Sequence, residues 1–563
     1  MTNRLATILL LSLACAAARA QMHVHAPPSE PRVDLAKLPA PQQIAGIGHA
    51  HIPITTRSAQ VQAWFDQGLA LVHCFWDYEA LRAFEQAVRL DPDCAMCRWG
   101  LFQALWYAGA DAQAKEELAR AKALSDKASD REQRYIRAES AYVEKSGEEG
   151  EKAYAHEMEA LIDRYPDDLQ ARLLYAGHLG AGYDEHAEPR AGTIYEQMLL
   201  RSVLAVAPEN AAANHYWIHA VEDSGHPERA LESAGRLAQL APSSGHIVHM
   251  PGHIYYKLGD YERARTSFLA SMQVDTAYMA AQHVSANDDW NYAHNLSYLV
   301  AACAESGRYR EARTHALSLA GLADDPNSRA NAGFYVIQIG ATATRLALRY
   351  GRWDEAIVHP LAVGVPEERL EIWARDYRDG LVTYARAMQS LEQQRLGEAD
   401  AQARQLDALL WSLGEVKLTG NQQQWRQRVS DLLATSSLEL RAALAAAHGE
   451  PERSAELFQR ATDAERKLGY SEPPQYSRPA EEAQGAALLR AGHYPEARKA
   501  YQEALQRRPH SGFALYGIAR SFELEGQRPA AVRAYREFLD AWRQADPDLP
   551  QLSVARAFIA SGS

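Results

Sequence analysis

Small residues recur at a fixed spacing along this chain, and that spacing constrains the fold more than any other feature. Ala230 and Ala264 stand 34 residues apart, and so do Ala497 and Ala531. A period of this length is typical of a repeat of two antiparallel helices, which pack closely where glycine or alanine faces the neighbouring helix. The chain is therefore predicted to be a continuous array of stacked helical pairs rather than a set of separate globular domains.

Three glycines share the same pattern of residues on their C-terminal side. Each is followed after 12 residues by alanine and after 16 residues by an aromatic residue. This is the signature of the tetratricopeptide repeat, and strand signals are nearly absent. The sequence thus predicts an all-α fold, a tetratricopeptide-repeat superhelix (α-solenoid). The three sets are Gly68, Ala80 and Phe84; Gly252, Ala264 and Phe268; and Gly485, Ala497 and Tyr501.

The N-terminal segment predicts export. Arg4 precedes a short apolar run, and small residues then form a cleavage site before Gln21. No later run reaches the roughly 20 apolar residues that a spanning helix needs. We therefore expect a periplasmic or secreted protein with no transmembrane segment. The predicted divisions are a signal peptide over 1–20, a proline-rich linker over 21–57, an N-terminal repeat array over 58–320, a C-terminal repeat array over 321–545 and a tail over 546–563.

Charge and cysteine content exclude some functions and leave others open. The chain has 59 Lys+Arg against 72 Asp+Glu, a net charge of -13, and no basic stripe of the kind that nucleic acid binding needs. We therefore expect no nucleic acid partner. Cys94 and Cys97 have the spacing of a redox pair, but no strand–helix–strand pattern surrounds them. A local disulfide, two partly buried thiols and a metal role are the alternatives for this pair.

Histidines concentrate in one part of the chain, where residues 178–294 hold ten of the 21. Three of them stand at i, i+3 and i+7, so they share one stripe of a helix, and two more stand at i and i+4 one repeat earlier. The repeat register places both sets on the inner, concave wall of the array. These five residues are His215, His219, His246, His249 and His253.

Neutral imidazole is the commonest protein ligand for transition metals. The five histidines are therefore predicted to converge on one site for copper, zinc or iron in the concave groove. His178, His294 and Asp223 are candidates for the remaining ligand positions, and Glu222 offers a second carboxylate beside Asp223. A metal rarely takes more than four such ligands, so one or two of the five would orient ligands or contact substrate.

The remaining candidate site residues are mostly aromatic. Familiar enzyme signatures are missing, since the pair at His215 and His219 lacks the glutamate of a zincin, and there is no phosphate-binding loop. Any reaction would be metal-centred, which predicts a metal-dependent hydrolase or oxidoreductase acting on a small molecule or peptide. The alternatives are a metal-free scaffold for a peptide or an envelope protein, and a metal buffer or carrier. Substrate contacts are predicted for Tyr216, Tyr256, Trp290 and His226.

Several segments together resemble a widespread family of bacterial, often exported tetratricopeptide-repeat proteins, distantly similar to an animal repeat protein of the same class. The most specific segment is His-x-x-His-Met-Pro-x-His at 246–253. The resemblance implies the repeat fold and no particular reaction. The other segments are His73–Trp76, Asp91–Met96, Asn214–Pro227, His294–Leu296 and Glu472–Pro474.

Overall fold

The computed structural model describes residues 33–184, 186–286, 289–322, 334–358, 370–415 and 417–561. Within these ranges every regular secondary-structure element is a helix. The only strand-like pairing there is one isolated bridge between Tyr183 and Pro189. The predicted all-α fold class is confirmed. The export signal predicted at 1–20 and the first part of the linker lie outside the described residues.

The chain folds into two compact units. The first comprises Met1–Ile254 and Ala270–Asn291, and the second comprises Tyr255–Leu269 and Tyr292–Ser563. Three helices contribute residues to both units. They are α12 (Gly245–Lys257), α13 (Tyr261–Gln282) and α14 (Trp290–Glu305).

The first compact unit is built largely from successive helical pairs, such as α2 with α3, α4 with α5 and α6 with α7. Its helices are α2 (Ala59–His73), α3 (Asp77–Leu90), α4 (Ala95–Tyr107), α5 (Asp111–Leu124), α6 (Asp130–Lys145), α7 (Gly147–Arg164), α8 (Leu169–Leu179), α9 (Ala191–Val206), α10 (Ala211–Glu222) and α11 (Leu231–Leu240). Short 3-10 helices lie at Leu35–Lys37, Ser125–Lys127 and Pro227–Ala230.

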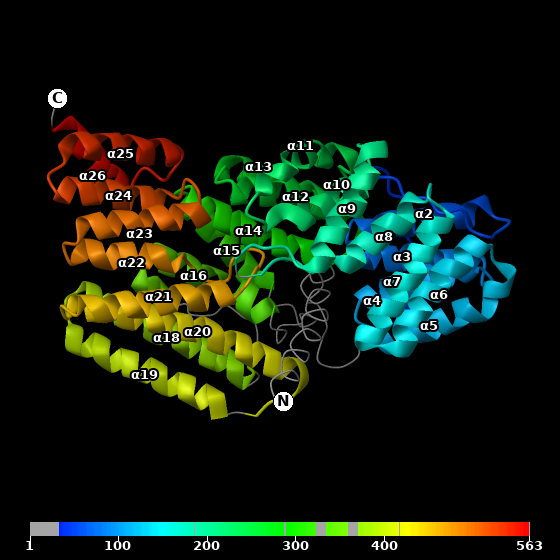
Figure 1. Cartoon of the computed structure of the whole chain (residues 1–563), viewed down its shortest axis with the longest axis horizontal. Helices are drawn as coiled ribbons and strands as arrows, with labels where there is room; N and C mark the ends of the chain where they lie inside the picture. The colour runs from blue at the N-terminus through cyan, green and yellow to red at the C-terminus, as the bar shows by residue number, and fades with distance from the viewer. Residues whose placement is uncertain are drawn as a thin grey trace, which may run out of the picture. The chain divides into compact units, whose positions relative to one another are not determined.

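The second compact unit continues the same arrangement, and helices α22 to α25 lie side by side in succession (Figure 1). It contains one π-helix, η4 (Phe334–Gly340). Its other helices are α15 (Tyr309–Leu322), α16 (Thr342–Arg349), α17 (Trp353–Val358), α18 (Ile372–Glu392), α19 (Leu396–Glu415), α20 (Gly420–Ala447), α21 (Pro451–Lys467), α22 (Ala480–Arg490), α23 (Tyr494–Arg507), α24 (Gly512–Leu524), α25 (Arg528–Ala541) and α26 (Pro550–Ala560).

The glycines of the repeat pattern lie where two helices touch. A Cβ atom added to Gly68 on α2 would come within 2.7 Å of the Phe84 ring on α3, and one added to Gly485 on α22 would come within 2.9 Å of the Tyr501 ring on α23. Because Cβ atoms essentially never approach other heavy atoms so closely, only glycine permits this packing. The spacing found in the sequence thus has a steric cause in both units.

The structure decides between the alternatives for the cysteine pair. Cys94 and Cys97 form a disulfide at the start of α4, and both are buried. Cys74 and Cys303 are buried thiols. The pair at the start of α4 is therefore a local cross-link.

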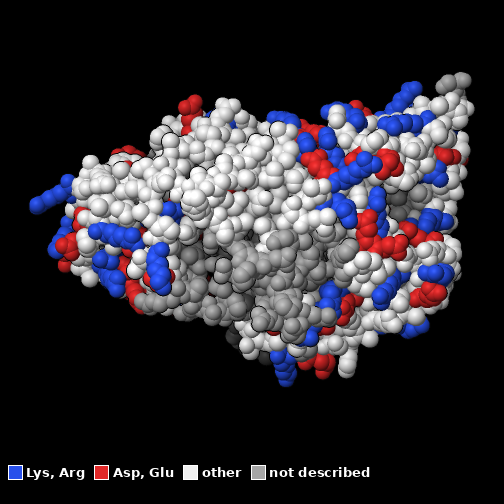
Figure 2. Space-filling model, turned by 180° about the vertical axis from the view of Figure 1, so that it is seen from behind, with Lys and Arg blue, Asp and Glu red and all other residues white. Residues whose placement is uncertain are grey.

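Charge is mixed over the molecular face drawn in Figure 2. Lys and Arg side chains there lie among Asp and Glu side chains, with no continuous basic stripe on that face.

Of the helices in the described ranges, none combines the length and the apolar character needed to cross a membrane.

Candidate metal centre

Two helices of the first compact unit carry the histidines of interest. His215 and His219 lie one turn apart on α10, which begins at the capping residue Asn210, and the other three lie on α12. The rings meet between the helices, since the centroid of His215 lies 5.0 Å from that of His246, and the centroid of His219 lies 6.0 Å from that of His253. The structure thus brings all five predicted histidines together.

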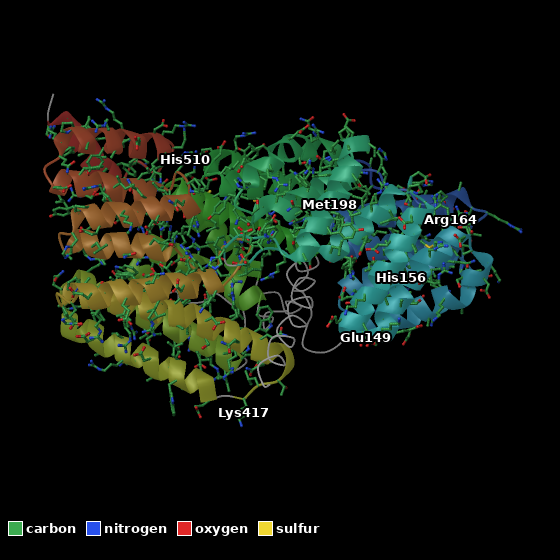
Figure 3. All side chains as sticks on the ribbon, viewed as in Figure 1. Glu149, His156, Arg164, Met198, Lys417 and His510 are labelled. Atoms are coloured by element: carbon green, nitrogen blue, oxygen red, sulfur yellow. A yellow bond between two sulfur atoms is a disulfide. The ribbon has the colours of Figure 1, made fainter. Side chains whose placement is uncertain are left out.

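Four of the five imidazoles are buried and that of His219 is nearly so, whereas some other histidines of the chain are exposed. His215 and His249 are fully inaccessible, and His219, the most exposed of the five, has only 13% of its side chain accessible. By contrast, His156 on α7 and His510 after α23 lie on the surface (Figure 3). Burial penalises a charged imidazole, and a metal requires the neutral form.

Three of the five come close enough to share one metal ion. One ring nitrogen from each of His215, His219 and His246 lies within 4.8 Å of the corresponding nitrogen of the other two. All three belong to the first compact unit. We refer to His215, His219 and His246 as the histidine triad.

Hydrogen bonds to the protein fix the orientation of two triad rings. His215 Nδ1 lies 2.7 Å from the carbonyl oxygen of His73, and because a carbonyl can only accept, Nδ1 carries the proton. His246 Nδ1 lies 3.1 Å from Asn291 Oδ1, while the amide Nδ2 of Asn291 donates to Asp275 at 2.8 Å. Both neutral rings therefore direct the lone pair of Nε2 toward the centre of the triad.

The separation between these two Nε2 atoms suits a shared metal. They lie 3.1 Å apart. Two nitrogen ligands at about 2.0–2.1 Å from a tetrahedral zinc ion would lie roughly 3.3 Å from one another. Two lone pairs that face one another repel unless a cation lies between them. The placement of these two Nε2 atoms therefore favours the binding of a cation.

One buried carboxylate orients histidines of both helices. Glu222 Oε1 accepts from His219 Nδ1 at 2.7 Å, and Glu222 Oε2 accepts from His253 Nδ1 through a short bond. His253 Nε2 in turn lies 2.6 Å from His249 Nε2. A carboxylate bonded to the far nitrogen of a ligating imidazole is the usual outer partner of a protein metal site.

The pKa values of the centre indicate a neutral ring at His215 beside an ionised carboxylate at Glu222. Burial, followed by repulsion from His219, holds the pKa of His215 well below its ordinary value. Burial alone would raise the pKa of Glu222, but the attraction and hydrogen bonds of His253 and His219 outweigh it and hold that pKa well below the usual range. Glu222 is therefore ionised and His215 is neutral at physiological pH.

Aromatic side chains cover one side of the triad. The Phe75 ring stacks on His219 and His246 at centroid distances of 5.6 and 5.4 Å and meets His215 edge-on at 4.6 Å. Trp290 lies 5.1 Å from His246, and its indole N–H donates to the carbonyl oxygen of Phe75 at 3.0 Å. Phe75 adopts φ 54°, an uncommon value for a residue other than glycine that clusters at functional sites. These rings form an aromatic wall on that side of the triad.

Other predicted residues of the first compact unit have different neighbours. His178 on α8 lies 2.5 Å from a carboxylate oxygen of Glu151 and stacks on Tyr154, so it lies outside the triad. Asp223 is the half-buried C-terminal cap of α10, and Glu222 rather than Asp223 contacts the histidines. His226 is exposed beside Glu228.

The predicted substrate contacts also differ among themselves. The Tyr216 hydroxyl lies 2.9 Å from His73 Nδ1 and is engaged inside the protein, whereas Trp290 contacts the triad directly. Tyr256 and His294 belong to the second compact unit. There Tyr256 packs against Tyr261 and Tyr298, and His294 lies 3.6 Å from Glu472.

Three residues of the centre were not identified as site residues from the sequence, namely His73, Phe75 and Asn291. His73 and Phe75 stand in one of the segments that carry the family resemblance, so that segment was the available signal. Asn291 has no such signal, because only folding brings it within 3.1 Å of His246.

Comparison with known proteins identifies the repeats directly. Family models of the tetratricopeptide repeat match residues 247–278 and residues 482–511. The first match covers most of α12 and α13, and the second covers α22 and α23. These helical pairs are tetratricopeptide repeats, as the 34-residue spacing predicted. No curated protein sequence matches the chain significantly.

Three solved structures are similar to the chain at low sequence identity. The human IFIT1 dimer with m7Gppp-AAAA is 12% identical over 85% of this chain and 94% of that chain, with a TM-score of 0.31. Yeast Tom70 is 12% identical over 89% of this chain and 96% of that chain, with a TM-score of 0.26. The TPR domain of P58(IPK) is 11% identical over 90% of this chain and 99% of that chain, with a TM-score of 0.21.

Proposed function

We propose that this tetratricopeptide-repeat protein binds one transition-metal ion at the histidine triad. The observation that supports the proposal most is the convergence of three imidazole nitrogens within 4.8 Å in a buried site. Each of the three rings also bonds through Nδ1 to an acceptor in the protein, which sets its orientation without using Nε2. Protein metal sites hold their histidines in this way.

Zinc and copper suit the donor set better than iron does. Neutral imidazoles favour zinc and copper, whereas non-haem iron sites commonly add a carboxylate to two histidines. The nearest carboxylate, Glu222, is directed at the Nδ1 atoms of His219 and His253 and thus acts as an outer partner. Three histidines would leave one tetrahedral position for water or a small ligand, as in catalytic zinc sites. In this proposal the protein is either a metal-dependent enzyme or a metal carrier.

The alternative function is a metal-free scaffold for a peptide or an envelope protein. It is favoured by the two matched repeats, because tetratricopeptide repeats generally mediate protein interactions. The burial of the triad argues against a peptide at this place, since an extended chain needs an exposed wall and an ion does not. A peptide would have to bind elsewhere on the repeats.

Metal analysis of the purified full chain tests the proposal. We expect elemental analysis to find one equivalent of zinc or copper per chain, or titration calorimetry to show that chelator-treated protein takes up one equivalent. A His215→Ala, His246→Ala double variant should lose this equivalent, while His156→Ala, which changes an exposed histidine of the same compact unit, should retain it. The proposal is wrong if the native protein contains no metal and binds neither zinc nor copper.

Export is part of the same proposal. The N-terminal pattern ending before Gln21 is that of a cleaved signal, so the metal would be acquired outside the cytoplasm. N-terminal sequencing of the protein recovered from the periplasm or medium should begin at Gln21. Recovery of chains that still carry residues 1–20 would contradict it.

A further inference from the structure

The second compact unit contains a cavity that the metal proposal does not use. Its volume is about 50 Å³. Since a single water needs roughly 10–15 Å³ on this measure, the cavity has room for a guest of a few non-hydrogen atoms. Its walls consist of residues of α14 and α16 together with Tyr256, Pro473, Pro474, Tyr476, Ser477 and Arg508.

Two of the three arginines that line this cavity are neutralised by carboxylates. Arg349 donates to both oxygens of Glu305, at 3.2 and 3.0 Å, and to Glu482 at 2.5 Å. Arg508 donates to Glu305 at 2.9 Å. These two cations and two anions balance one another, as buried ion pairs must if they are to persist.

Arg345, the third arginine, brings an additional positive charge. It is 9% exposed. Within the described part of the chain its hydrogen bonds go to uncharged partners, namely the carbonyl oxygens of Ile337 and Gln338, the hydroxyl of Thr342 and the phenol of Tyr377. Burial lowers the pKa of this guanidinium, although arginine stays charged in proteins. Among the residues that the structure describes, the cavity therefore has one positive charge that no bonded carboxylate offsets.

Backbone carbonyl groups hold the guanidinium group of Arg345 in place. Ile337 and Gln338 belong to the π-helix η4, whose carbonyls receive the guanidinium. π-Helical turns are rare and occur frequently at functional sites. Arg345 and Arg349 lie one turn apart on α16, so both reach the same cavity.

The rest of the wall is largely apolar. Val300 and Ala301 on α14, Leu346 on α16 and Pro474 line it beside the arginines. A bare inorganic anion could pair with Arg345 but would leave its charge against the apolar groups, whereas a carboxylate on a short hydrocarbon chain matches both parts of the wall. We propose that this cavity binds a short-chain organic acid, with its carboxylate at Arg345 and its hydrocarbon part against Val300, Leu346 and Pro474.

Titration calorimetry with propionate as the probe tests the proposal on the full chain. We expect propionate to bind with one site per chain, and propionamide, which has the same shape without the charge, to bind at least tenfold more weakly. Phosphate should also bind at least tenfold more weakly than propionate. If propionamide or phosphate binds as well as propionate, the assignment to a carboxylate with an apolar body is wrong.

Variants locate the site. Arg345→Gln removes the additional charge and should weaken propionate binding at least tenfold, whereas Arg386→Gln, at an exposed position of α18, should leave it unchanged. Ala301→Leu fills the cavity and keeps every charge, so it should also abolish binding while circular dichroism shows a folded chain. Unchanged propionate affinity in folded Ala301→Leu would overturn the proposal even if Arg345→Gln fails to fold.

Discussion

The two compact units bury polar groups in opposite ways. The first buries five imidazoles, of which His215 and His246 direct Nε2 atoms at one another 3.1 Å apart. The second buries the charged groups Glu305, Arg349 and Glu482, which bond to one another. Paired charges of this kind neutralise one another and stabilise the fold. Neutral rings held through Nδ1 instead keep several Nε2 atoms together, where they can bind a cation.

This difference implies that mutations in the two places should be separable. A change in the ion-pair network should affect the free energy of unfolding without affecting metal content. A change in the histidine triad should affect metal affinity far more than it affects folding. The predictions for Glu305, His219 and Glu222 below test this separation.

The largest effect is expected for Glu305→Gln. This change leaves Arg349 and Arg508 buried without their shared carboxylate, which should lower the free energy of unfolding by about 3–5 kcal/mol at pH 7 in urea titrations. Glu456→Gln, at an exposed position of α21, should change it by less than about 0.5 kcal/mol. Metal content should be the same in both variants.

The effect of Glu305→Gln should depend on pH with a definite sign. Burial alone would raise the pKa of Glu305, but Arg349 and Arg508 outweigh it and lower that pKa below the ordinary value of 4.5. The stabilisation by the carboxylate is therefore complete above pH 4.5 and is lost as the pH falls through the folded-state pKa. The difference between wild type and variant should shrink in acid, and a constant difference would show that the pairs do not act as charges.

His219→Ala should change the free energy of unfolding less than Glu305→Gln does, but it should lower metal affinity more than any other single change. Loss of an outer partner of a metal site typically costs about 10–100-fold in affinity, so loss of a ligand should cost more than about 100-fold. His448→Ala changes a histidine of the second compact unit that contacts Asp400 near the surface and should have no effect. Equal metal affinity in these two variants, measured by competition with a chromophoric chelator, would mean that the triad is structural.

Glu222→Gln should have an intermediate effect on metal affinity. The amide keeps one acceptor oxygen but presents an NH₂ group where the carboxylate now accepts from either His219 or His253. We expect a loss of about 10–100-fold in zinc or copper affinity. Glu228→Gln is a matched control, since Glu228 also contacts a histidine, His226, but on the surface. A Glu222→Gln variant with full affinity would place this carboxylate outside the metal site.

The smallest effects concern the packing that both units share. A Cβ atom at Gly100 on α4 would lie 2.3 Å from the Phe84 ring, so Gly100→Ala should destabilise the protein by about 1–3 kcal/mol. Gly235 lies inside α11 with nothing near its would-be Cβ atom, and Gly235→Ala should stabilise the protein by about 0.5–1 kcal/mol. Changes of opposite sign in the melting temperature of the two variants would support close helix packing as the reason for glycine at Gly100. Changes of the same sign would contradict it.

The sequence by itself determined the fold class and the grouping of the five histidines. Both depend on local periodicity, since residues at i, i+3 and i+7 share a helical stripe whatever the rest of the chain does. The 34-residue spacing likewise reports which residues face a neighbouring helix, as Gly68 against Phe84 shows. These features are set by the helix and by its nearest partner.

Only the tertiary structure decided how the histidines are held. His215 bonds to the backbone of His73, 142 positions away, and Trp290 bonds to the backbone of Phe75, 215 positions away. The choice of Glu222 over Asp223 depends on which side chain faces His219 and His253, because both carboxylates lie about one helical turn after His219 in the sequence. Contacts between distant residues have no period, because they arise when separate helices meet, and so no local pattern predicts them.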